Sequence, residues 1–171
     1  MEAMDMLLTR RSCRSYKADP VPRETIERIV TAGLYAPNGM GRQSAIILAV
    51  TDKAVRDQLS AANAAVIGTK DDPFYGAPVV LVVLADRSVG TYVEDGSLVM
   101  GNLLNAAHAE GLGSCWIHRA RQEFEAQEGK ALLAKLGIEG DYVGIGHCIL
   151  GFPADPAGEA APRREGRAFY L

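Results

Sequence analysis

The chain has 171 residues, of which 48% are hydrophobic and 23% are charged, and its formal net charge is −3. These values are typical of a soluble globular domain that can bury a sizeable core. They argue against a general nucleic-acid binder, which needs a basic face, and no apolar run approaches the roughly 20 residues of a membrane span.

The N-terminal residues lack the pattern of a targeting signal. Glu2 and Asp5 lie among the first methionines, where a signal peptide would carry a basic and then an apolar segment. The cysteines are three in number and widely spaced: Cys13, Cys115 and Cys148. This spacing favours free thiols in a reducing compartment over a disulfide framework. We therefore expect a cytoplasmic protein.

Two helices are predicted before the first strand. Residues 1–9 predict a short helix, and a second helix begins at Pro22, a residue suited to the first helical turn. The apolar residues of the second helix recur at helical spacing and predict one buried face: Ile26, Ile29, Val30, Gly33 and Leu34. The turn-forming sequence Pro37-Asn38-Gly39 ends this helix and opens a loop through Gln43.

Two strands with a helix between them follow. Residues 45–51 form a continuous apolar run with β-branched side chains, which predicts a strand covered on both faces. Asp52 is suited to cap the next helix. After a polar loop at residues 68–76, residues 78–85 are the most strand-like run in the sequence.

The next segment, residues 95–110, predicts a helix of a different kind. Its apolar residues leave no wide polar face: Leu98, Val99, Met100, Leu103, Leu104, Ala106, Ala107 and Ala109. Such a helix is buried in a large core or between subunits. In a chain of this length, a subunit interface is the more economical explanation.

The remaining segments predict a short strand at 115–117, a helix at 122–136 and a strand at 142–150. Gly144 and Gly146 in the last strand leave room for close packing.

Residues 151–171 are rich in Pro, Ala and Gly and have no core pattern, so we expect a C-terminal arm that stays loose or wraps a neighbour. Helices and strands mix without regular βαβ alternation. The sequence therefore predicts an α+β fold, a sheet with helices on both sides, in a single domain spanning residues 1–171.

Cationic and hydroxyl side chains cluster after the first predicted helix, in Arg10-Arg11-Ser12-Cys13-Arg14-Ser15-Tyr16. The planar guanidinium group suits bidentate contact with a phosphate, and serine adds a neutral donor. The alternative is a solvated helix end, where late arginines complement the helix dipole.

Three further segments accompany this cluster in a fixed order: Ala36–Gln43, Glu110–Ile117, and Gly151-Phe152-Pro153 with the later Pro162–Arg167. Together they resemble the nitroreductase family of FMN-dependent oxidoreductases over nearly the whole chain. The resemblance implies a nitroreductase-like α/β sandwich with a central, mostly antiparallel sheet flanked by helices. It also implies an intertwined homodimer with FMN at the interface and the C-terminal arm crossing to the partner.

The resemblance assigns FMN-binding roles to both ends of the chain. Arg10 and Ser12, with Arg11 beside them, would hold the phosphate, and Arg163 and Arg164 of the tail would join them. The alternative for the two tail residues is solvated linker charge. Arg14 would lie at the pyrimidine edge of the ring and stabilise the negative charge of the reduced flavin.

The resemblance assigns contact with the flavin ring to two further segments. One is the loop Pro37-Asn38-Gly39-Met40 of the other subunit, with Gln43 as a partner for the ribityl chain or ring edge. The other is Trp116-Ile117-His118 on the opposite ring face. The chain departs from its relatives at Gly41, where Asn is common, and at Ser44-Ala45, where Pro-Trp is common.

The implied activity is reduction of nitroaromatics, quinones or similar electron-poor acceptors by NADH or NADPH, in a ping-pong reaction. Flavin N5 carries the hydride, so no protein residue is expected to be catalytic. Two alternatives stay open: a non-catalytic flavin-binding or storage protein, and a specialised relative that acts on flavin or halogenated aromatics.

Several other residues have a structural and a functional interpretation. The pairs Cys115/His118 and His147-Cys148 lie in apolar, strand-like runs, which indicates core residues rather than zinc ligands, so we expect no metal. Phe74, Tyr75 and Trp116 either line a pocket for aromatic acceptors or belong to the core.

Overall fold

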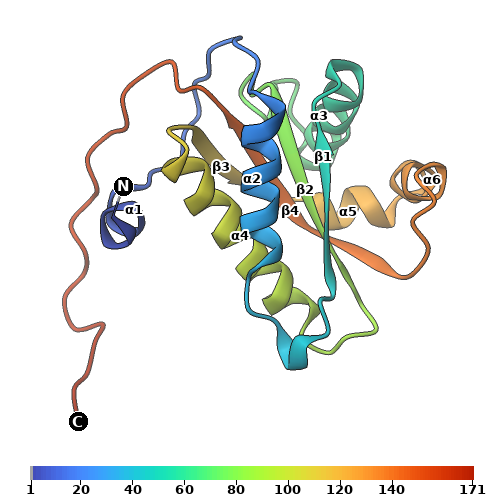
Figure 1. Ribbon diagram of the computed structural model, residues 1–171. Coiled ribbons are helices and arrows are strands. Elements are labelled where there is room, and N and C mark those ends of the chain that lie inside the picture. The colour runs from blue at the N-terminus through green and yellow to red at the C-terminus, as the bar shows by residue number, and fades with distance from the viewer. Residues whose placement is uncertain (1) are drawn as a thin grey trace.

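The computed structural model describes residues 2–171, so the first residue of the helix predicted at 1–9 lies outside the described residues. Its strands form one antiparallel sheet in the order β1-β2-β4-β3 (Figure 1). The bounds are Ala45–Val50 for β1, Val79–Asp86 for β2, Gly113–Ile117 for β3 and Tyr142–Gly151 for β4. β1 and β3 are therefore the two edges of the sheet.

Helices cover both faces of the sheet (Figure 1), as the predicted α+β sandwich requires. One face carries α2 (Arg23–Leu34) and the long α4 (Tyr92–Ala109). The opposite face carries α3 (Lys53–Ile67), α5 (Ala120–Glu125) and α6 (Gln127–Lys135). The short α1 (Ala3–Thr9) contacts α4, and a single 3₁₀ turn spans Gly39–Gly41.

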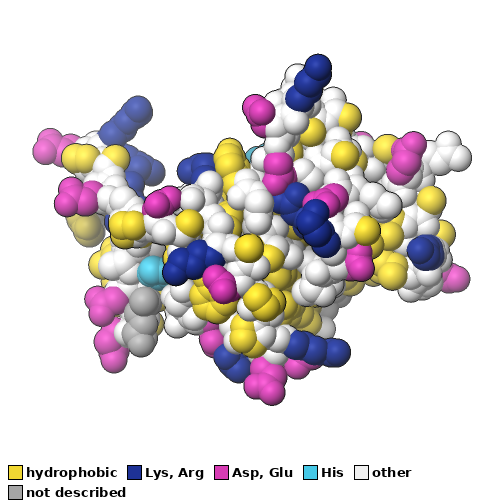
Figure 2. Space-filling model, turned by 90° about the horizontal axis from the view of Figure 1, so that it is seen from above, with side chains coloured by type: hydrophobic (Ala, Val, Ile, Leu, Met, Phe, Trp, Pro, Cys, Tyr) yellow, Lys and Arg dark blue, Asp and Glu magenta, His cyan; other side chains and the backbone are white. Residues whose placement is uncertain are grey.

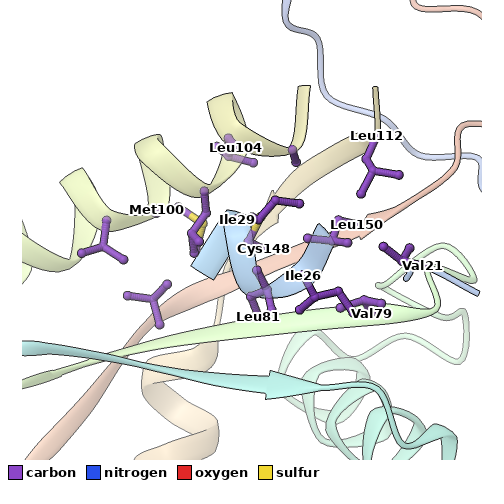
Figure 3. Packing of buried hydrophobic residues seen from close by; sticks show 14 of the residues in the cluster. Val21, Ile26, Ile29, Val79, Leu81, Met100, Leu104, Leu112, Cys148 and Leu150 are labelled. Carbon is purple, nitrogen blue, oxygen red and sulfur yellow. The ribbon is translucent and has the colours of Figure 1, made fainter. Parts of the chain in front are cut away.

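The central strand β2 separates two hydrophobic clusters. Its side chains alternate, so Val79, Leu81 and Val83 face α2 and α4, while the residues between them face α3 and α5. Figure 3 shows the first cluster, where Ile29 of α2 and Met100 of α4 converge on the sheet. Burial of each such side chain contributes about 1.5–3 kcal/mol to stability.

The two glycines of β4 allow close packing, as the sequence predicted. A Cβ at Gly144 would lie 2.2 Å from the backbone of Ala120, and one at Gly146 would lie 2.1 Å from Nε1 of Trp116. The start of α5 therefore lies directly on β4, and the Trp116 ring lies directly on its neighbouring strand.

The structure differs from the sequence predictions at four elements. The helix predicted at 122–136 is two helices, because Ala126 is extended. The first strand is a half-buried edge strand rather than one covered on both faces. Leu34, predicted to be buried, is 52% exposed at the end of α2, and the long helix begins at Tyr92 rather than at Asp95.

The surface in Figure 2 carries both signs of charge without a large patch of one sign. No helix within residues 2–171 is long and apolar enough to cross a bilayer.

Candidate functional site

The segment after α1 is fixed beside the edge strand β3. Ser12 forms a parallel bridge with Ser114, whose carbonyl accepts a 2.9 Å hydrogen bond from the Cys13 N–H. Further along, the Tyr16 hydroxyl donates to the Cys13 carbonyl at 2.8 Å. The arginine cluster is therefore held by backbone pairing rather than left as a frayed helix end.

Two guanidinium groups of this segment are partly buried and incompletely satisfied. Arg11 donates through Nη1 to the carbonyls of Leu8 and Arg10, at 2.9 and 2.7 Å. Among residues 2–171, buried Nε of Arg11 and buried Nη1 of Arg10 have no acceptor. A buried cationic donor without a partner is costly, so the pair is suited to receive an anionic group.

His108, near the end of α4, adds a third basic group that the sequence did not single out. Its Nε2 lies 2.8 Å from Oγ1 of Thr9, the last residue of α1. Burial lowers the pKa of the imidazole, and the charges of Arg10 and Arg11 lower it further. Three basic groups thus converge from two elements, and an anion between them would relieve their repulsion.

A pocket of about 420 Å³ opens at this cluster. It is bounded by Arg11, Ser12, Cys13, Arg14, Ser15, His108, Gly111, Leu112, Gly113, Pro153, Asp155, Pro156, Ala157 and Gly158. Asp155 is the only acid in that set, and it forms no ion pair within residues 2–171. The pocket is therefore electropositive.

The loop at 37–43 is held by the buried carboxylate of Asp95 on α4. Asp95 accepts hydrogen bonds from the Gly39 N–H at 2.8 Å, the Ser44 hydroxyl at 2.6 Å and the Thr91 hydroxyl at 3.2 Å. Burial alone would raise the pKa of Asp95, but these three donors outweigh it and the pKa lies below its ordinary value. The carboxylate is thus ionised at neutral pH and fixes the start of the loop.

Two residues of this loop are strained. Met40 and Gln43 have φ values of 54° and 49°, in the left-handed region that non-glycine residues rarely adopt. The Asn38 Oδ1 accepts from the Gln43 N–H at 2.9 Å and closes the loop. Met40 is 82% exposed, so the tip of the loop presents an apolar side chain to solvent.

At the other end of β3, Trp116 and His118 stack with their rings 5.8 Å apart and 8° from parallel. The His118 carbonyl accepts a 2.7 Å hydrogen bond from Asn63 of α3. Arg119, which follows, has a φ of 82°. Strained residues of this kind concentrate at functional sites.

The sequence matches the Nitroreductase family over residues 7–68 and 68–152. A relative in Archaeoglobus fulgidus, provisionally named as an NADH dehydrogenase/NAD(P)H nitroreductase, is 31% identical over 90% of this chain and 87% of its own length.

The chain belongs to the nitroreductase family.

Solved structures agree with this fold. An FMN-bound nitroreductase of Bacteroides fragilis superposes with a TM-score of 0.89, at 23% identity, over 100% of this chain and 99% of that one. An iodotyrosine deiodinase bound to FMN and 3-iodo-L-tyrosine superposes with a TM-score of 0.78, at 22% identity, over 98% of both chains. The α+β sandwich predicted from the sequence is therefore the nitroreductase fold.

Within one chain of this nitroreductase-family protein, the predicted cofactor residues fall into separate groups. Arg11, Ser12 and Arg14 line the pocket near His108, and the charge of Arg10 is close enough to lower the pKa of that imidazole. The 37–43 loop is tied to Asp95, about 20 Å away along α4 at 1.5 Å per residue. It also precedes β1, whereas Trp116, Ile117 and His118 lie at the opposite edge of the sheet.

The tail arginines are not brought to the cluster within one chain. Arg163 and Arg164 are exposed, and neither forms a hydrogen bond or ion pair among residues 2–171. Figure 1 shows the arm leaving the body of the molecule after β4 and passing beside α1. The arm's contacts with the body are near its start, where the Ala154 N–H donates to the Ser15 carbonyl at 3.0 Å.

The residues singled out for other roles are mostly structural. Phe74 is fully buried and contacts the His147 ring edge-on at 5.1 Å, so its side chain belongs to the core. Tyr75 is 44% exposed with a φ of 52°. No group of three or more metal-ligating side chains in suitable geometry occurs within residues 2–171.

A buried polar cluster behind His118 was missed by the sequence analysis. Glu123 Oε1 lies 2.9 Å from Nε2 of His147 and accepts from Asn63 at 2.5 Å. Because Asn63 also donates to the His118 carbonyl, the cluster fixes the end of β3 from the face of the sheet that carries α3 and α5. The three residues are widely separated in sequence, so no local pattern predicts their contact.

Proposed function

We propose that the chain binds FMN and, as a homodimer, uses NADH or NADPH to reduce nitroaromatics, quinones or similar electron-poor acceptors. The observation that carries this proposal is the pair of buried, unpartnered donors of Arg10 and Arg11 beside His108 and Ser12. This donor set fits a phosphate, because guanidinium and hydroxyl groups are the usual partners of phosphate. No acidic side chain within residues 2–171 forms an ion pair with Arg10 or Arg11.

Each group of residues has its own task in this proposal. Arg10, Arg11 and Ser12 hold the phosphate, and Arg14, exposed at the rim of the same pocket, supplies a cation for the pyrimidine edge of the ring. The Trp116–His118 end of β3 lies against one ring face. Bound FMN supplies the hydride chemistry between the nicotinamide and the acceptor, so the protein's task is binding, orientation and electrostatics.

A second copy of the chain completes the site. β1 and β3 are three strand spacings apart, about 14 Å, so the Asn38–Gly39 loop and the Trp116 segment of one chain do not enclose one ring. Exposed apolar side chains offer a surface for the partner: Met4, Leu7, Leu8, Leu34, Tyr35, Met40, Val93 and Leu98.

The test is to purify the protein and follow its flavin absorbance without oxygen. We expect a yellow protein that NADH or NADPH bleaches, and whose colour returns when a nitroaromatic or a quinone is added. A yellow protein that neither nucleotide bleaches would favour the alternative of a flavin-binding or storage protein. A protein that does not retain or bind FMN would refute the proposal.

A further inference from the structure

A second pocket opens beside the Trp116–His118 stack. It has a volume of about 400 Å³, which is within the range of small-molecule sites. Its walls are the two stacked rings, apolar side chains of α4 and β4, and polar side chains at the start of α5: Tyr92, Val93, Ser97, Trp116, His118, Arg119, Arg121, Gln122, Val143, Gly144 and Ile145. No carboxylate is in this set.

Two arginines at this pocket differ in their partners. Arg121 donates to Glu125 at 3.2 Å and forms an ion pair with it. Arg119 is exposed, and within residues 2–171 it forms no side-chain hydrogen bond or ion pair. The pocket therefore offers one free guanidinium group next to a flat aromatic wall.

The backbone of Arg119 is held in its strained conformation from several sides. The carbonyl before it is bound by Asn63, its own carbonyl accepts from the Glu123 N–H at 3.2 Å, and Ala120 lies directly on Gly144. Glycine would adopt a φ of 82° without strain. An arginine in that position is explained if its side chain has a use there.

We propose that this pocket is the acceptor side of the site and that it selects aromatic acceptors carrying a carboxylate, which Arg119 binds. The aromatic part of the acceptor would lie in this pocket, next to the flavin ring that the Trp116 segment borders, and the planar guanidinium would donate two parallel hydrogen bonds to the carboxylate. The inference rests on the proposed function, because it takes the Trp116 segment to border the flavin.

The test compares 4-nitrobenzoate with its neutral analogue 4-nitrobenzamide, in the holoprotein and in the variants Arg119→Gly, Arg119→Lys and Arg121→Gln. In Arg119→Gly, we expect kcat/KM for 4-nitrobenzoate to fall about tenfold or more, as loss of a charged hydrogen bond implies. The value for 4-nitrobenzamide should change less than about threefold by the same reasoning. Differences in reactivity between the two acceptors cancel, because each is compared across variants.

Two controls accompany this comparison. Arg121→Gln removes a cation from the same rim and should leave the preference for 4-nitrobenzoate over 4-nitrobenzamide unchanged. Arg119→Lys should retain part of that preference. The melting temperature of Arg119→Gly should not fall below that of the native protein, because glycine relieves the strain at this position. A lower rate in that variant would then not be due to unfolding.

Three results would overturn the inference: an equal loss for both acceptors, no loss for either, or a loss confined to flavin reduction by NADH or NADPH. The last would mean that Arg119 binds the nucleotide. Calorimetric titration of the holoprotein with benzoate and benzamide gives a readout without turnover. If the protein reduces neither nitro compound, the proposed function fails, and tighter binding of benzoate that Arg119→Gly abolishes would still support the pocket's preference.

Discussion

At the scale of single residues, the site is defined by donors that lack acceptors. Arg11 is anchored by the carbonyls of Leu8 and Arg10, yet Arg10 and Arg11 each retain a buried nitrogen without a partner among residues 2–171. A solvated helix end would expose these atoms to water. The structure therefore favours an anion-binding cluster over a solvated helix end.

The first prediction concerns Arg10. Replacing it with alanine removes a charged hydrogen bond to the phosphate, worth about 1.5–3 kcal/mol, so the Kd for FMN should rise about 10- to 150-fold. Fluorescence titration of the flavin-free protein measures this change. Lys17→Ala is the matched control, since Lys17 is an exposed cation of the same segment outside the pocket. Native affinity in Arg10→Ala would contradict the assignment.

The second prediction concerns His108 and pH. Its pKa is lowered in the flavin-free protein, by burial first and then by the two arginines, and a bound phosphate would raise it again. FMN binding should therefore take up a proton, and affinity should increase as the pH falls from 8 to 6.5, by at most about tenfold per pH unit. Flavin titration across this range measures the slope.

His108→Asn is the control for this slope. Phosphate itself has a pKa near 6, but that protonation is common to both proteins, so the difference between their curves reports the imidazole. The lowered pKa also predicts that the flavin-free protein loses stability as the pH falls below about 6.5, because the unfolded chain binds a proton that the folded one excludes. If FMN affinity had the same dependence on pH in both proteins, His108 would have no role in phosphate binding.

Sequence reasoning found the arginines but not His108 or Asp95, and the reason is physical. A histidine near the end of a helix has no distinctive neighbours in sequence, and its meaning comes from α1 packing beside it. Asp95 did carry a signal. It lies four residues before buried Val99, on the buried side of α4, where an acid requires several donors.

At the scale of elements, α4 connects the parts of the site. Its N-terminal half holds the 37–43 loop through Asp95, and its C-terminal half places His108 beside the arginines. The same helix packs against α2 and the sheet through Met100 and Leu103. Its position is therefore set by the core, and the site inherits that rigidity.

The third prediction concerns the anchor between α4 and the loop. Asp95→Asn is isosteric but turns an amide donor towards groups that already donate, so unfolding free energy should fall by about 1–3 kcal/mol. Urea denaturation at pH 7 measures this loss. Glu94→Gln is the control, because the neighbouring Glu94 is exposed.

The effect of Asp95 also has a defined pH dependence. Its folded pKa is lowered, so its stabilisation is complete above the unfolded value near 3.9 and is lost as the pH falls through the folded pKa. The difference in unfolding free energy between the native protein and Asp95→Asn should decrease below about pH 4. If this difference stayed constant down to pH 2, the charge of the carboxylate would not contribute to the stabilisation by Asp95.

The elements themselves were largely predictable from the sequence, with one informative failure. Helical spacing located α2, the capping residue Asp52 located the start of α3, and apolar runs located α4 and the strands. The break between α5 and α6 has no proline or local turn signal. It arises from packing, since a Cβ at Gly129 would lie 2.3 Å from the Glu123 carbonyl oxygen. Such a contact between helices cannot be seen in a local window.

At the scale of the whole molecule, the order of the strands was not available from the sequence, because it depends on long-range pairing. That order separates the two predicted ring-contacting segments onto opposite edges of the sheet. A single chain therefore does not bring both segments to one flavin ring, as the proposed function requires. This arrangement is the main physical argument for a homodimer, together with the exposed apolar side chains of α1 and α4.

The last prediction concerns the C-terminal arm. Residues 159–171 are exposed throughout and form no backbone hydrogen bonds with the body, and Phe169 and Tyr170 are 83% and 95% exposed. Deleting them should not affect the stability of an isolated chain. If the arm instead crosses to a partner, deletion after Gly158, which keeps the wall of the pocket, should weaken both dimerisation and FMN binding, because the partner loses apolar contacts and two cations.

Equilibrium sedimentation and flavin titration separate these two effects. The full-length double variant Arg163→Ala/Arg164→Ala removes only the cations, so it should weaken FMN binding while leaving the monomer–dimer equilibrium unchanged. Phe169→Ala/Tyr170→Ala removes only aromatic area, so it should weaken dimerisation while leaving FMN binding unchanged. The free energy of dimerisation should fall by up to a few kcal/mol if both rings are buried on the partner. A truncated protein that sediments and binds FMN like the full chain would mean that the arm stays solvated, and the tail arginines would then have no place in the phosphate site.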